Sequence, residues 1–379
     1  GGESAVINPG AMIGIVGGGQ LARMSALAAR AMGYRIAVAD PDPNCPAAGV
    51  ADEVVVARLD SPEGVAPLAA LCEVVTYEFE NIDPTVLQRL AREVPVHPGV
   101  RVLEASQNRI KEKSSLAGMG VPVAPWRAVH GAEDFAAAIR TIGVPSVLKT
   151  ATEGYDGKGQ VVIRTAAEAP AAYAKLAGRP LVLEGFVPFE REVSVVVARN
   201  RQGAVAAFPV AENIHRQNIL ALSIVPARVS PETAEAARSL AVRIASELEL
   251  VGVLGVEMFV LGDGSLAVNE LAPRPHNSGH YSMDACVTSQ FEQHIRAVCG
   301  LPLGSVELLS PVVMANIMGE DYPLNVPDAL SDPLVKLHLY GKREARPARK
   351  MGHLNALGAT VAEALARAEA ARERLTARG

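Results

Sequence analysis

Strand and helix signals alternate over the first hundred residues of the chain. The apolar run Met12–Val16 ends at three consecutive glycines, Gly17 to Gly19, and residues 20–32 then carry apolar side chains at helical spacing. The same alternation continues, with strand patterns at 35–39, 54–57 and 74–77 and helical patterns at 61–71 and 84–93. Such an alternation is typical of an α/β fold, in which helices cover a parallel sheet.

The rest of the chain has a different pattern. A helix at about Ser106–Ala117 is expected to link the first part to a region, residues 145–271, that is rich in strands and Gly-containing hairpin turns. Helical patterns at 131–141, 166–177 and 231–249 make this region α+β. After Gly304 come short strands, a basic cluster at 342–350 and a helix at 361–377. We therefore expect three domains, at residues 1–110, 111–305 and 306–379.

Composition excludes several classes of protein. With 49% apolar and 20% charged residues, the chain has a globular balance, and its net charge of −5 argues against a nucleic-acid binder. The four cysteines form no Cys-x-x-Cys pair, so neither a disulfide framework nor a zinc site is expected. No apolar run approaches the roughly 20 residues that span a bilayer, and no secretory signal is evident, so we expect no membrane partner and a cytoplasmic protein.

The first glycine-rich turn has two interpretations. Gly17, Gly19 and Ala22 follow a strand and open a helix, and Asp40 lies about 20 residues further on, as in a dinucleotide-binding fingerprint. A nicotinamide-dependent oxidoreductase is therefore one candidate. The phosphate of another small molecule could use the same helix N-terminus, and the turn could also bind nothing.

A second glycine-rich segment, residues 153–160, lies between two strand-like runs. Its three glycines and Lys158 suit a loop that closes over phosphates, although its order is not that of a P-loop. The alternative is a solvated hairpin loop. Lys149 favours the phosphate site, because a lysine in the apolar strand Val147-Leu148-Lys149 is costly unless it meets an anion.

Two glutamates are predicted to face each other across a hairpin. If Asp263-Gly264 is a two-residue turn, Glu257 lies directly opposite Glu270. The same face is expected to carry the apolar side chains of a core, those of Phe259, Leu261, Leu266 and Val268. Like charges so placed destabilise a sheet unless one is protonated or a cation lies between them, and carboxylate oxygens suit Mg²⁺. The alternative is a shifted register with both glutamates exposed.

Three further polar segments accompany these features. Residues 272–280 follow the hairpin directly and are dense in hydrogen-bond donors, and Arg274 would reach an anion beside the metal. Residues 77–81 follow a strand of the first domain, where parallel sheets bind ligands. The cluster at 342–350 is interpreted as a phosphate pocket or a solvated hairpin rather than a nucleic-acid patch.

Taken together, these motifs resemble the N5-carboxyaminoimidazole ribonucleotide synthase family of the ATP-grasp superfamily. The resemblance covers residues 12–357 and rests on segments 17–21, 77–81, 154–160, 269–280 and 349–353. It implies a Rossmann-like pre-ATP-grasp domain, a central ATP-grasp domain and a small C-terminal β/α domain. It also implies that a homodimer uses ATP, Mg²⁺ and bicarbonate to carboxylate 5-aminoimidazole ribonucleotide through carboxyphosphate, in de novo purine biosynthesis. The products would be N5-carboxyaminoimidazole ribonucleotide, ADP and phosphate.

The resemblance also assigns roles to residues. ATP would be bound by Arg109, Lys149, Gly154, Tyr155, Asp156, Gly157, Lys158, Gly159, Gln160, Glu184, Gly185, Phe186, Val187, Glu192, His215, Asn269 and Glu270. The ribonucleotide would be bound by Gln20, Leu21, Glu78, Glu80, Asn81, Arg274, His276, Asn277, Ser278, Lys342, Arg349 and Lys350. The catalytic groups would be Arg274, Tyr155, Asp156 and His280, with Mg²⁺ on Glu257 and Glu270. Many ATP-grasp enzymes have a metal-side Asn two residues past the second Glu; here that residue is Ala272, and Asn269 precedes the Glu instead.

Three alternatives to this function remain. A formate-using ATP-grasp transformylase would share the architecture but act on glycinamide ribonucleotide; the run His276–His280 favours the carboxylating family. The nicotinamide-dependent oxidoreductase leaves the paired glutamates and the 153–160 segment unexplained. A catalytically silent ATP-binding regulator is disfavoured by the full set of charged site residues.

Overall fold

The computed structural model describes residues 5–154 and 158–378. The N-terminal sheet consists of four parallel strands in the order β3-β2-β1-β4, as the alternating pattern predicts. The strands are β1 (Met12–Val16), β2 (Arg35–Asp40), β3 (Glu53–Val56) and β4 (Val74–Tyr77), and the helices are α1 (Gln20–Ala31), α2 (Pro62–Val65), α3 (Pro67–Leu71) and α4 (Pro84–Ala91). The single helix expected at 61–71 is two short helices, since Pro67 has no N–H to continue the first.

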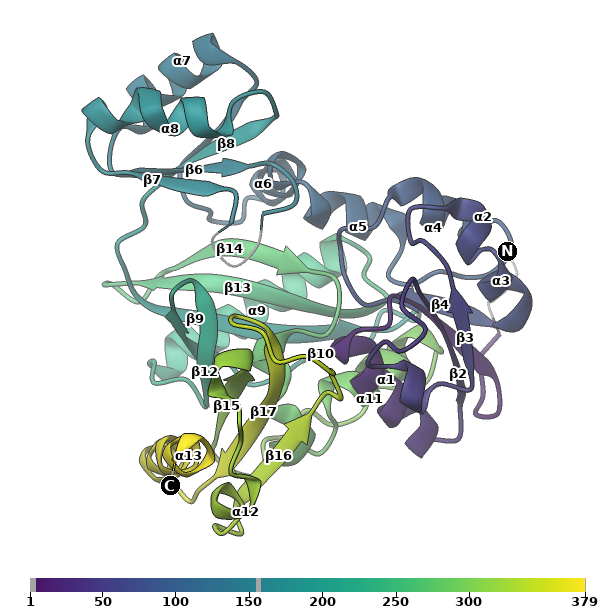
Figure 1. The fold of residues 1–379 in the computed structure, drawn as a ribbon. Helices are drawn as coiled ribbons and strands as arrows, with labels where there is room; N and C mark the ends of the chain where they lie inside the picture. Colours follow the sequence, from purple (N-terminus) through teal and green to yellow (C-terminus); the bar gives the residue numbers. More distant parts are fainter. Residues whose placement is uncertain (1–4, 155–157, 379) are drawn as a thin grey trace.

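The predicted linking helix is also interrupted. Two helices, α5 (Val100–Gln107) and α6 (Arg109–Gly118), meet at Asn108, whose backbone is extended with φ −117° and ψ 121°. The Asn108 side chain accepts hydrogen bonds from the N–H groups of Ile110 and Lys111 and so caps α6. The predicted continuous helix is therefore wrong at this residue, and the break turns the start of α6 toward the centre of the molecule (Figure 1).

A small antiparallel sheet follows α6 and projects from the rest of the molecule at the top of Figure 1. Its strand order is β5-β8-β6-β7, with β5 (Trp126–Val129), β6 (Ser146–Thr150), β7 (Gln160–Ile163) and β8 (Leu181–Gly185). Helices α7 (Ala132–Ile142) and α8 (Ala169–Leu176) cover one face and share a core with the sheet. Its other face is therefore available to the body of the molecule.

The large sheet runs through the central and C-terminal parts of the chain without a break. Its order is β14-β13-β9-β11-β12-β15-β17-β16, with β10 added beside β9. The strands are β9 (Phe189–Arg199), β10 (Val205–Ala207), β11 (Ala211–Arg216), β12 (Ile219–Val225), β13 (Gly252–Leu261), β14 (Leu266–Ala272), β15 (Val312–Met318), β16 (Val335–Leu339) and β17 (Lys350–Leu357). The pairing of β12 with β15 joins the two parts.

Helices on the large sheet complete the cores. Helix α9 (Pro231–Glu247) packs on β9 and β13, and α13 (Val361–Thr376) packs on β15 and β17. Helix α11 (Gln290–Val298) also packs against α1, which fixes the N-terminal sheet to the body. The remaining short elements are α10 (Ser282–Ala285), α12 (Val326–Ala329), and 3₁₀ turns at Ala48–Val50, Ala166–Glu168, Asn277–Gly279 and Gly319–Asp321. Among the described residues, no helix is both long and apolar enough to cross a membrane.

Candidate active site

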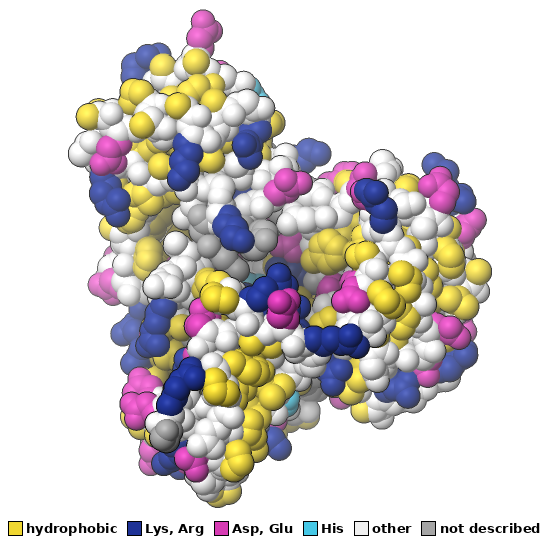
Figure 2. All heavy atoms as spheres, viewed as in Figure 1, with side chains coloured by type: hydrophobic (Ala, Val, Ile, Leu, Met, Phe, Trp, Pro, Cys, Tyr) yellow, Lys and Arg dark blue, Asp and Glu magenta, His cyan; other side chains and the backbone are white. Residues whose placement is uncertain are grey.

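The surface is hollowed where the small sheet, the N-terminal sheet and the large sheet meet (Figure 2). Three cavities of about 420, 190 and 230 Å³ lie here. The first and second share Arg109, Glu257 and Glu270 among their lining residues, and the second and third share Arg274, Asn277 and Lys350. We call them the nucleotide-side, central and N-terminal cavities. Their shared walls make them one continuous site.

The predicted pairing of Glu257 with Glu270 is confirmed, although the turn that was expected to produce it is wrong. The hairpin turns through three residues, Gly262 to Gly264, because Leu261 and Ser265 close the loop. This shifts the register by one residue near the turn, and a bulge after Glu257 shifts it back. The register shifts caused by the three-residue turn and by the bulge thus cancel, and the two glutamates lie opposite each other.

The expected hydrophobic face around the two glutamates is also wrong. The core side of the hairpin carries Met258, Val260, Leu266 and Val268, whereas Phe259 and Leu261 are half-buried. The bulge explains the difference, because it transfers Leu266 and Val268 to the face opposite the glutamates. Glu257 and Glu270 therefore line the nucleotide-side and central cavities rather than a dry core.

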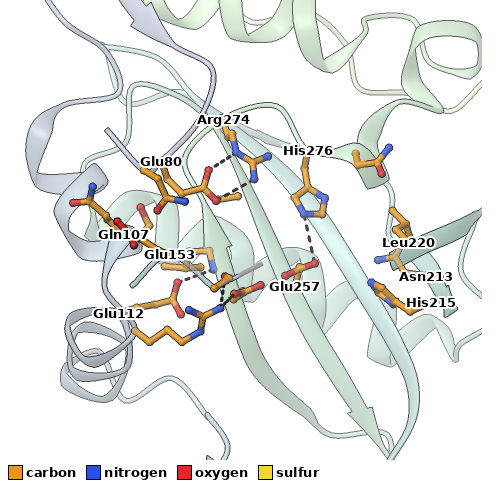
Figure 3. Close-up of a pocket in the computed structure, with 18 of the residues that line it drawn as sticks. Glu80, Gln107, Glu112, Glu153, Asn213, His215, Leu220, Glu257, Arg274 and His276 are labelled. Atoms are coloured by element: carbon orange, nitrogen blue, oxygen red, sulfur yellow. Dashed lines mark hydrogen bonds and ion pairs between the residues drawn. The ribbon is translucent and has the colours of Figure 1, made fainter. Parts of the chain in front are cut away.

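Burial and mutual repulsion control the charge of this pair. Glu270 Oε1 lies 3.0 Å from Arg109 Nη2, and Glu257 Oε1 lies 3.5 Å from His276 Nε2 (Figure 3). Burial and the negative charge of Glu257 raise the pKa of Glu270. Burial acts in the same direction on Glu257, but its hydrogen bonds to His276 and Glu270 outweigh it and lower its pKa. The pair thus favours a shared proton, which a hard cation would replace.

A buried cluster of two lysines and one glutamate lies at the inner end of the nucleotide-side cavity, which Lys149 and Glu184 line. Glu184 Oε2 lies 2.8 Å from Lys149 Nζ, and Glu184 Oε1 lies 3.3 Å from Lys113 Nζ. Burial alone would raise the pKa of Glu184, but the two ammonium groups outweigh it and lower the pKa to about 2. Lys149 meets an anion, as the sequence predicted, but this anion belongs to the protein itself.

Arg109 connects the second glycine-rich segment to the paired glutamates. Besides Glu270, its guanidinium donates to the carbonyl oxygens of Thr150, at 3.2 Å, and Gly154, at 2.9 Å. Gly159 has φ +68°, and a Cβ there would lie 2.7 Å from Thr150 Oγ1, so this position requires glycine. Strands β6 and β7 thus present the ends of the segment to the cavity.

The other predicted ATP-binding residues lie around the same cavity. Glu192 Oε2 is 2.9 Å from His215 Nδ1; burial opposes the proton on this imidazole, but the carboxylate outweighs burial and raises the pKa of His215. Lining the cavity with this pair are Gln160, Gly185, Phe186, Val187 and Asn269. Lys158 is exposed and is not among the residues that line it. Tyr155, Asp156 and Gly157 lie outside the described residues.

On the central-cavity side, Arg274 forms a bidentate ion pair with Glu80. Its Nε lies 2.5 Å from Glu80 Oε2 and its Nη2 lies 3.1 Å from Glu80 Oε1 (Figure 3). Burial opposes ionisation of Glu80, but the charge of Arg274 outweighs it and lowers the pKa of Glu80. Asn81, His276, Asn277 and Lys350 line the same cavity. Asn81 is exposed and the other three residues are half-buried, so all four keep access to a ligand.

The N-terminal cavity brings together residues from segments far apart in the sequence. It is lined by Gln20, Leu21, Glu78, Phe79, Arg274, Asn277, His280, Tyr340 and Lys350. Glu78 accepts hydrogen bonds from the N–H groups of Gly19, at 2.6 Å, and Ala22, at 3.0 Å, and thereby caps α1. Burial lowers the pKa of His280 well below its ordinary value, so this imidazole is neutral at pH 7.

Three predicted ribonucleotide-binding residues do not line any of these cavities. Ser278 is buried, and its Oγ lies 2.7 Å from Ser194 Oγ and 2.6 Å from His276 Nδ1, so it positions His276. Lys342 donates to the backbone carbonyl of Lys350 at 2.7 Å, and Arg349 donates to that of Glu344 at 2.8 Å. Lys342 therefore contacts the first residue of the strand that carries Lys350, and Arg349 stabilises the loop before that strand.

Several lining residues were not predicted from the sequence. Gln107, Glu112 and Asn213 line the central cavity, and Tyr340 lines the N-terminal cavity. Lys113, on α6, is buried behind the wall of the site and does not line it. Glu112 is buried, accepts a hydrogen bond from the Leu271 N–H at 3.1 Å, and burial raises its pKa to about 8. The run Lys111-Glu112-Lys113 was the available signal, because successive residues of a helix point about 100° apart and three charged neighbours therefore leave little of its circumference apolar.

Within residues 5–154 and 158–378, no three or more His, Cys, Asp and Glu side chains gather in a way that could hold a metal ion. The paired glutamates supply two carboxylates only. A cation bound there would complete its coordination with oxygens from a phosphate ligand and water, which is how Mg²⁺ is usually held beside nucleotides.

A small antiparallel sheet and a large sheet thus enclose a cavity that has Lys149 on one wall and two carboxylates on the other. This arrangement defines the class: the protein is an ATP-grasp enzyme. Family models agree with it along the chain. Residues 11–107 match a ribonucleotide synthetase preATP-grasp domain, residues 114–291 an ATP-grasp domain, and residues 312–367 a phosphoribosylaminoimidazole carboxylase C-terminal domain.

Named relatives and solved structures narrow the class to one family. An N5-carboxyaminoimidazole ribonucleotide synthase of Brucella melitensis is 50% identical over 93% of this chain and 98% of that protein, and one of Bacillus subtilis is 48% identical over 92% of each. The ADP complex of an N5-carboxyaminoimidazole ribonucleotide synthetase superposes with a TM-score of 0.93 at 51% identity, covering 97% of this chain and 98% of that one. The chain belongs to the N5-carboxyaminoimidazole ribonucleotide synthase family.

A third comparison concerns the ligands of a relative. The synthase of Aspergillus clavatus, solved in complex with ADP and 5-aminoimidazole ribonucleotide, superposes with a TM-score of 0.89 at 34% identity. It covers 96% of this chain and 99% of that one.

Proposed function

We propose that this protein joins bicarbonate to the amine of 5-aminoimidazole ribonucleotide at the expense of ATP, forming N5-carboxyaminoimidazole ribonucleotide, ADP and phosphate in purine biosynthesis. The observation that carries the proposal is the continuous site, in which the paired glutamates and Arg274 lie between a nucleotide-sized cavity and a second polar one. The ligands of the Aspergillus relative, ADP and the ribonucleotide, support the same pair of substrates.

ATP occupies the nucleotide-side cavity in this proposal. The adenine lies against the strand end Glu184–Val187, and Glu192 with His215 binds the ribose hydroxyls. Lys149 and Arg109 reach the phosphates, because both line the cavity and carry positive charge beside the glycine-rich segment. The γ-phosphate then lies at the boundary with the central cavity, next to Glu257 and Glu270.

Mg²⁺ fits the paired glutamates. Their facing carboxylates repel each other when both are ionised, and burial and this repulsion together raise the pKa of Glu270. A dication between them would remove the unfavourable interaction. Glu257 and Glu270 would hold it, and the bound ion would supply charge neutralisation for the phosphates. Asn269 lines the cavity beside Glu270 and is the nearest candidate for a further polar contact.

Bicarbonate is a poor electrophile and is activated first. Its oxygen attacks the γ-phosphorus, the bond to the ADP oxygen breaks, and carboxyphosphate forms. Arg274 and Lys350 line the central cavity and offset the negative charge of this intermediate. The amine of the ribonucleotide then attacks the carboxyl carbon, or carbon dioxide released in place; the C–N bond forms, phosphate leaves, and the amine loses one proton.

The ribonucleotide lies in the N-terminal cavity, with its amine toward the central one. Gln20, Asn277 and Lys350 offer polar contacts there, and Arg349 and Lys342 stabilise the strand around Lys350. Tyr155, Asp156 and His280 stay candidates for positioning the substrates or handling the proton. Of these, His280 is neutral, and because burial lowers its pKa it is a weak base.

An ADP-release assay tests the proposal. With Mg²⁺, ATP and bicarbonate, 5-aminoimidazole ribonucleotide should stimulate ADP release, whereas glycinamide ribonucleotide with formate should not. Release with the second pair alone would instead establish the transformylase. Absence of ADP with 5-aminoimidazole ribonucleotide would reject the main proposal.

A homodimer in the cytoplasm completes the proposal and rests on family likeness. Light scattering at micromolar concentration should give twice the mass of one 39.7 kDa chain. A stable monomer that retains full turnover would reject the dimer without affecting the proposed reaction.

A further inference from the structure

Lys113 stands out as a buried charge that the proposed reaction does not use. It lies on α6, its side chain is 1% exposed, and its ammonium contacts Glu184 at 3.3 Å and the Asn269 carbonyl oxygen at 3.2 Å. It therefore bridges the small sheet, through β8, and the large sheet, through β14. Lysines are almost never buried so completely unless they are paired.

The two lysines on Glu184 differ in what they can do. Lys149 is 16% exposed and lines the nucleotide-side cavity beside Gln160 and Glu270. Its four-carbon stem can turn toward a phosphate. Lys113 does not line that cavity and has both of its partners inside the protein. One lysine can exchange partners, whereas the other is fixed.

This difference matters when a phosphate competes for Lys149. A buried carboxylate that loses its only cation is strongly destabilised, because its charge is neither hydrated nor paired. With Lys113 in place, Glu184 keeps one ammonium after Lys149 leaves. Without Lys113, Lys149 could reach the phosphates only by leaving Glu184 unpaired.

We propose that Lys113 is the fixed counterion of Glu184 that allows Lys149 to exchange from Glu184 to the phosphates of ATP. Lys113 is thus a positioning residue that acts through Glu184 and Lys149 and does not touch the nucleotide. The inference rests on the proposed binding of ATP in the nucleotide-side cavity. It predicts that Lys113 affects binding of the phosphates but not of the nucleoside.

The test compares ATP with adenosine by calorimetric titration in the absence of bicarbonate. The ratio of the adenosine Kd to the ATP Kd measures the affinity that the phosphates add. Lys113→Met should lower this ratio by about tenfold or more, with adenosine binding unchanged. Lys111→Met, an exposed position on the same helix, is the matched control and should leave the ratio unchanged.

A second substitution separates this role from a structural one. In Lys113→Met/Glu184→Gln no buried carboxylate needs a cation, so the ratio should return to within about threefold of the wild-type ratio. An unchanged ratio in Lys113→Met, or a lowered ratio that Glu184→Gln does not restore, would overturn the inference. Failure of the wild-type protein to bind ATP at all would instead reject the proposed function.

A measurement on the wild-type protein covers the case in which Lys113→Met does not fold. In a crystal structure with a non-hydrolysable ATP analogue, Lys149 Nζ should lie on a phosphate oxygen while Lys113 Nζ stays within hydrogen-bond distance of Glu184. If Lys149 stays on Glu184, or if Lys113 leaves it, the inference is wrong.

Discussion

Two regions of this molecule carry polar groups beside glycines or glycine-rich segments, and they differ in how those groups are satisfied. At the N-terminal turn, Glu78 accepts hydrogen bonds from Gly19 and Ala22, and Asp40 accepts one from Gly18 at 2.9 Å. At the hairpin, Glu257 and Glu270 face each other, and burial together with the charge of Glu257 raises the pKa of Glu270. In the first region hydrogen bonds within the chain satisfy the carboxylates, whereas in the second two carboxylates face each other and favour a shared proton, which a cation could replace.

This difference bears on whether the N-terminal glycine turn binds a dinucleotide, as its sequence pattern would allow, or only connects a strand to a helix. The glycines of a dinucleotide fingerprint leave space for a pyrophosphate. Here a Cβ on Gly18 would lie 2.4 Å from Cys45 Sγ, and one on Gly19 would lie 2.6 Å from Glu78 Oε1. Protein side chains fill the space that a cofactor would need, so the nicotinamide interpretation loses its site and the turn is structural.

The largest expected effect is at the hairpin. Glu270→Gln removes one of the two carboxylates proposed to hold Mg²⁺ without changing the shape of the side chain. We expect kcat for ADP release to fall by about two to three orders of magnitude with the melting temperature preserved. Asp263→Asn, at the exposed turn of the same hairpin, is the control and should keep kcat. Normal turnover in Glu270→Gln would refute the metal assignment.

The N-terminal turn should respond in stability rather than in chemistry. Gly18→Ala places a Cβ against Cys45 Sγ and should lower the free energy of unfolding by about 1 to 3 kcal/mol in urea titrations. Gly99→Ala, where a Cβ would meet nothing within 4 Å, should change it far less. If Gly18→Ala were instead to weaken ATP binding while the fold stayed intact, the turn would belong to the nucleotide site.

Glu112 is a buried carboxyl group that should make the stability of the protein depend on pH. Its pKa is raised to about 8, so between about pH 4.3, the ordinary value, and pH 8 the folded protein keeps a proton that the unfolded chain has lost. Stability therefore falls as pH rises through this range. Glu112→Gln should remove this slope and raise the free energy of unfolding by about 1 to 3 kcal/mol at pH 7.5.

The control for Glu112 is Glu369→Gln, an exposed glutamate on α13. It should alter neither the slope nor the stability beyond about 0.5 kcal/mol. A Glu112→Gln variant that keeps the full pH slope would show that Glu112 is ionised in the folded protein.

The smallest expected effect is the change in melting temperature on adding a nicotinamide cofactor. ADP at about 100 times its Kd should stabilise the protein by about 2.7 kcal/mol and raise the melting temperature by a few degrees. Binding of NAD⁺ at the N-terminal glycine turn, at the same concentration, should shift the melting temperature by less than about 0.5 °C. A shift from NAD⁺ that Gly18→Ala abolishes would restore the dinucleotide interpretation.

Local patterns in the sequence predicted most of the framework. The alternation of apolar runs with helical spacing predicted the four parallel strands, because each pattern depends on neighbouring residues only. The linking helix was predicted without its break, since the capping role of Asn108 depends on where the chain turns. The hairpin pairing was predicted correctly through an incorrect turn, because a bulge restored the register.

What the sequence by itself determined is the architecture and most of the polar residues that line the site. The spacing of glycines, lysines and glutamates along strands and turns is a local property of the sequence. The resemblance to a known family then assigned expected roles to these residues. The tertiary structure alone decided which charges are paired: Glu78 reaches Gly19 across 59 positions, and Lys113 joins Lys149 on Glu184. Coulomb and hydration energies depend on distance and burial in space, so only the folded chain separates a satisfied carboxylate from one that requires a ligand.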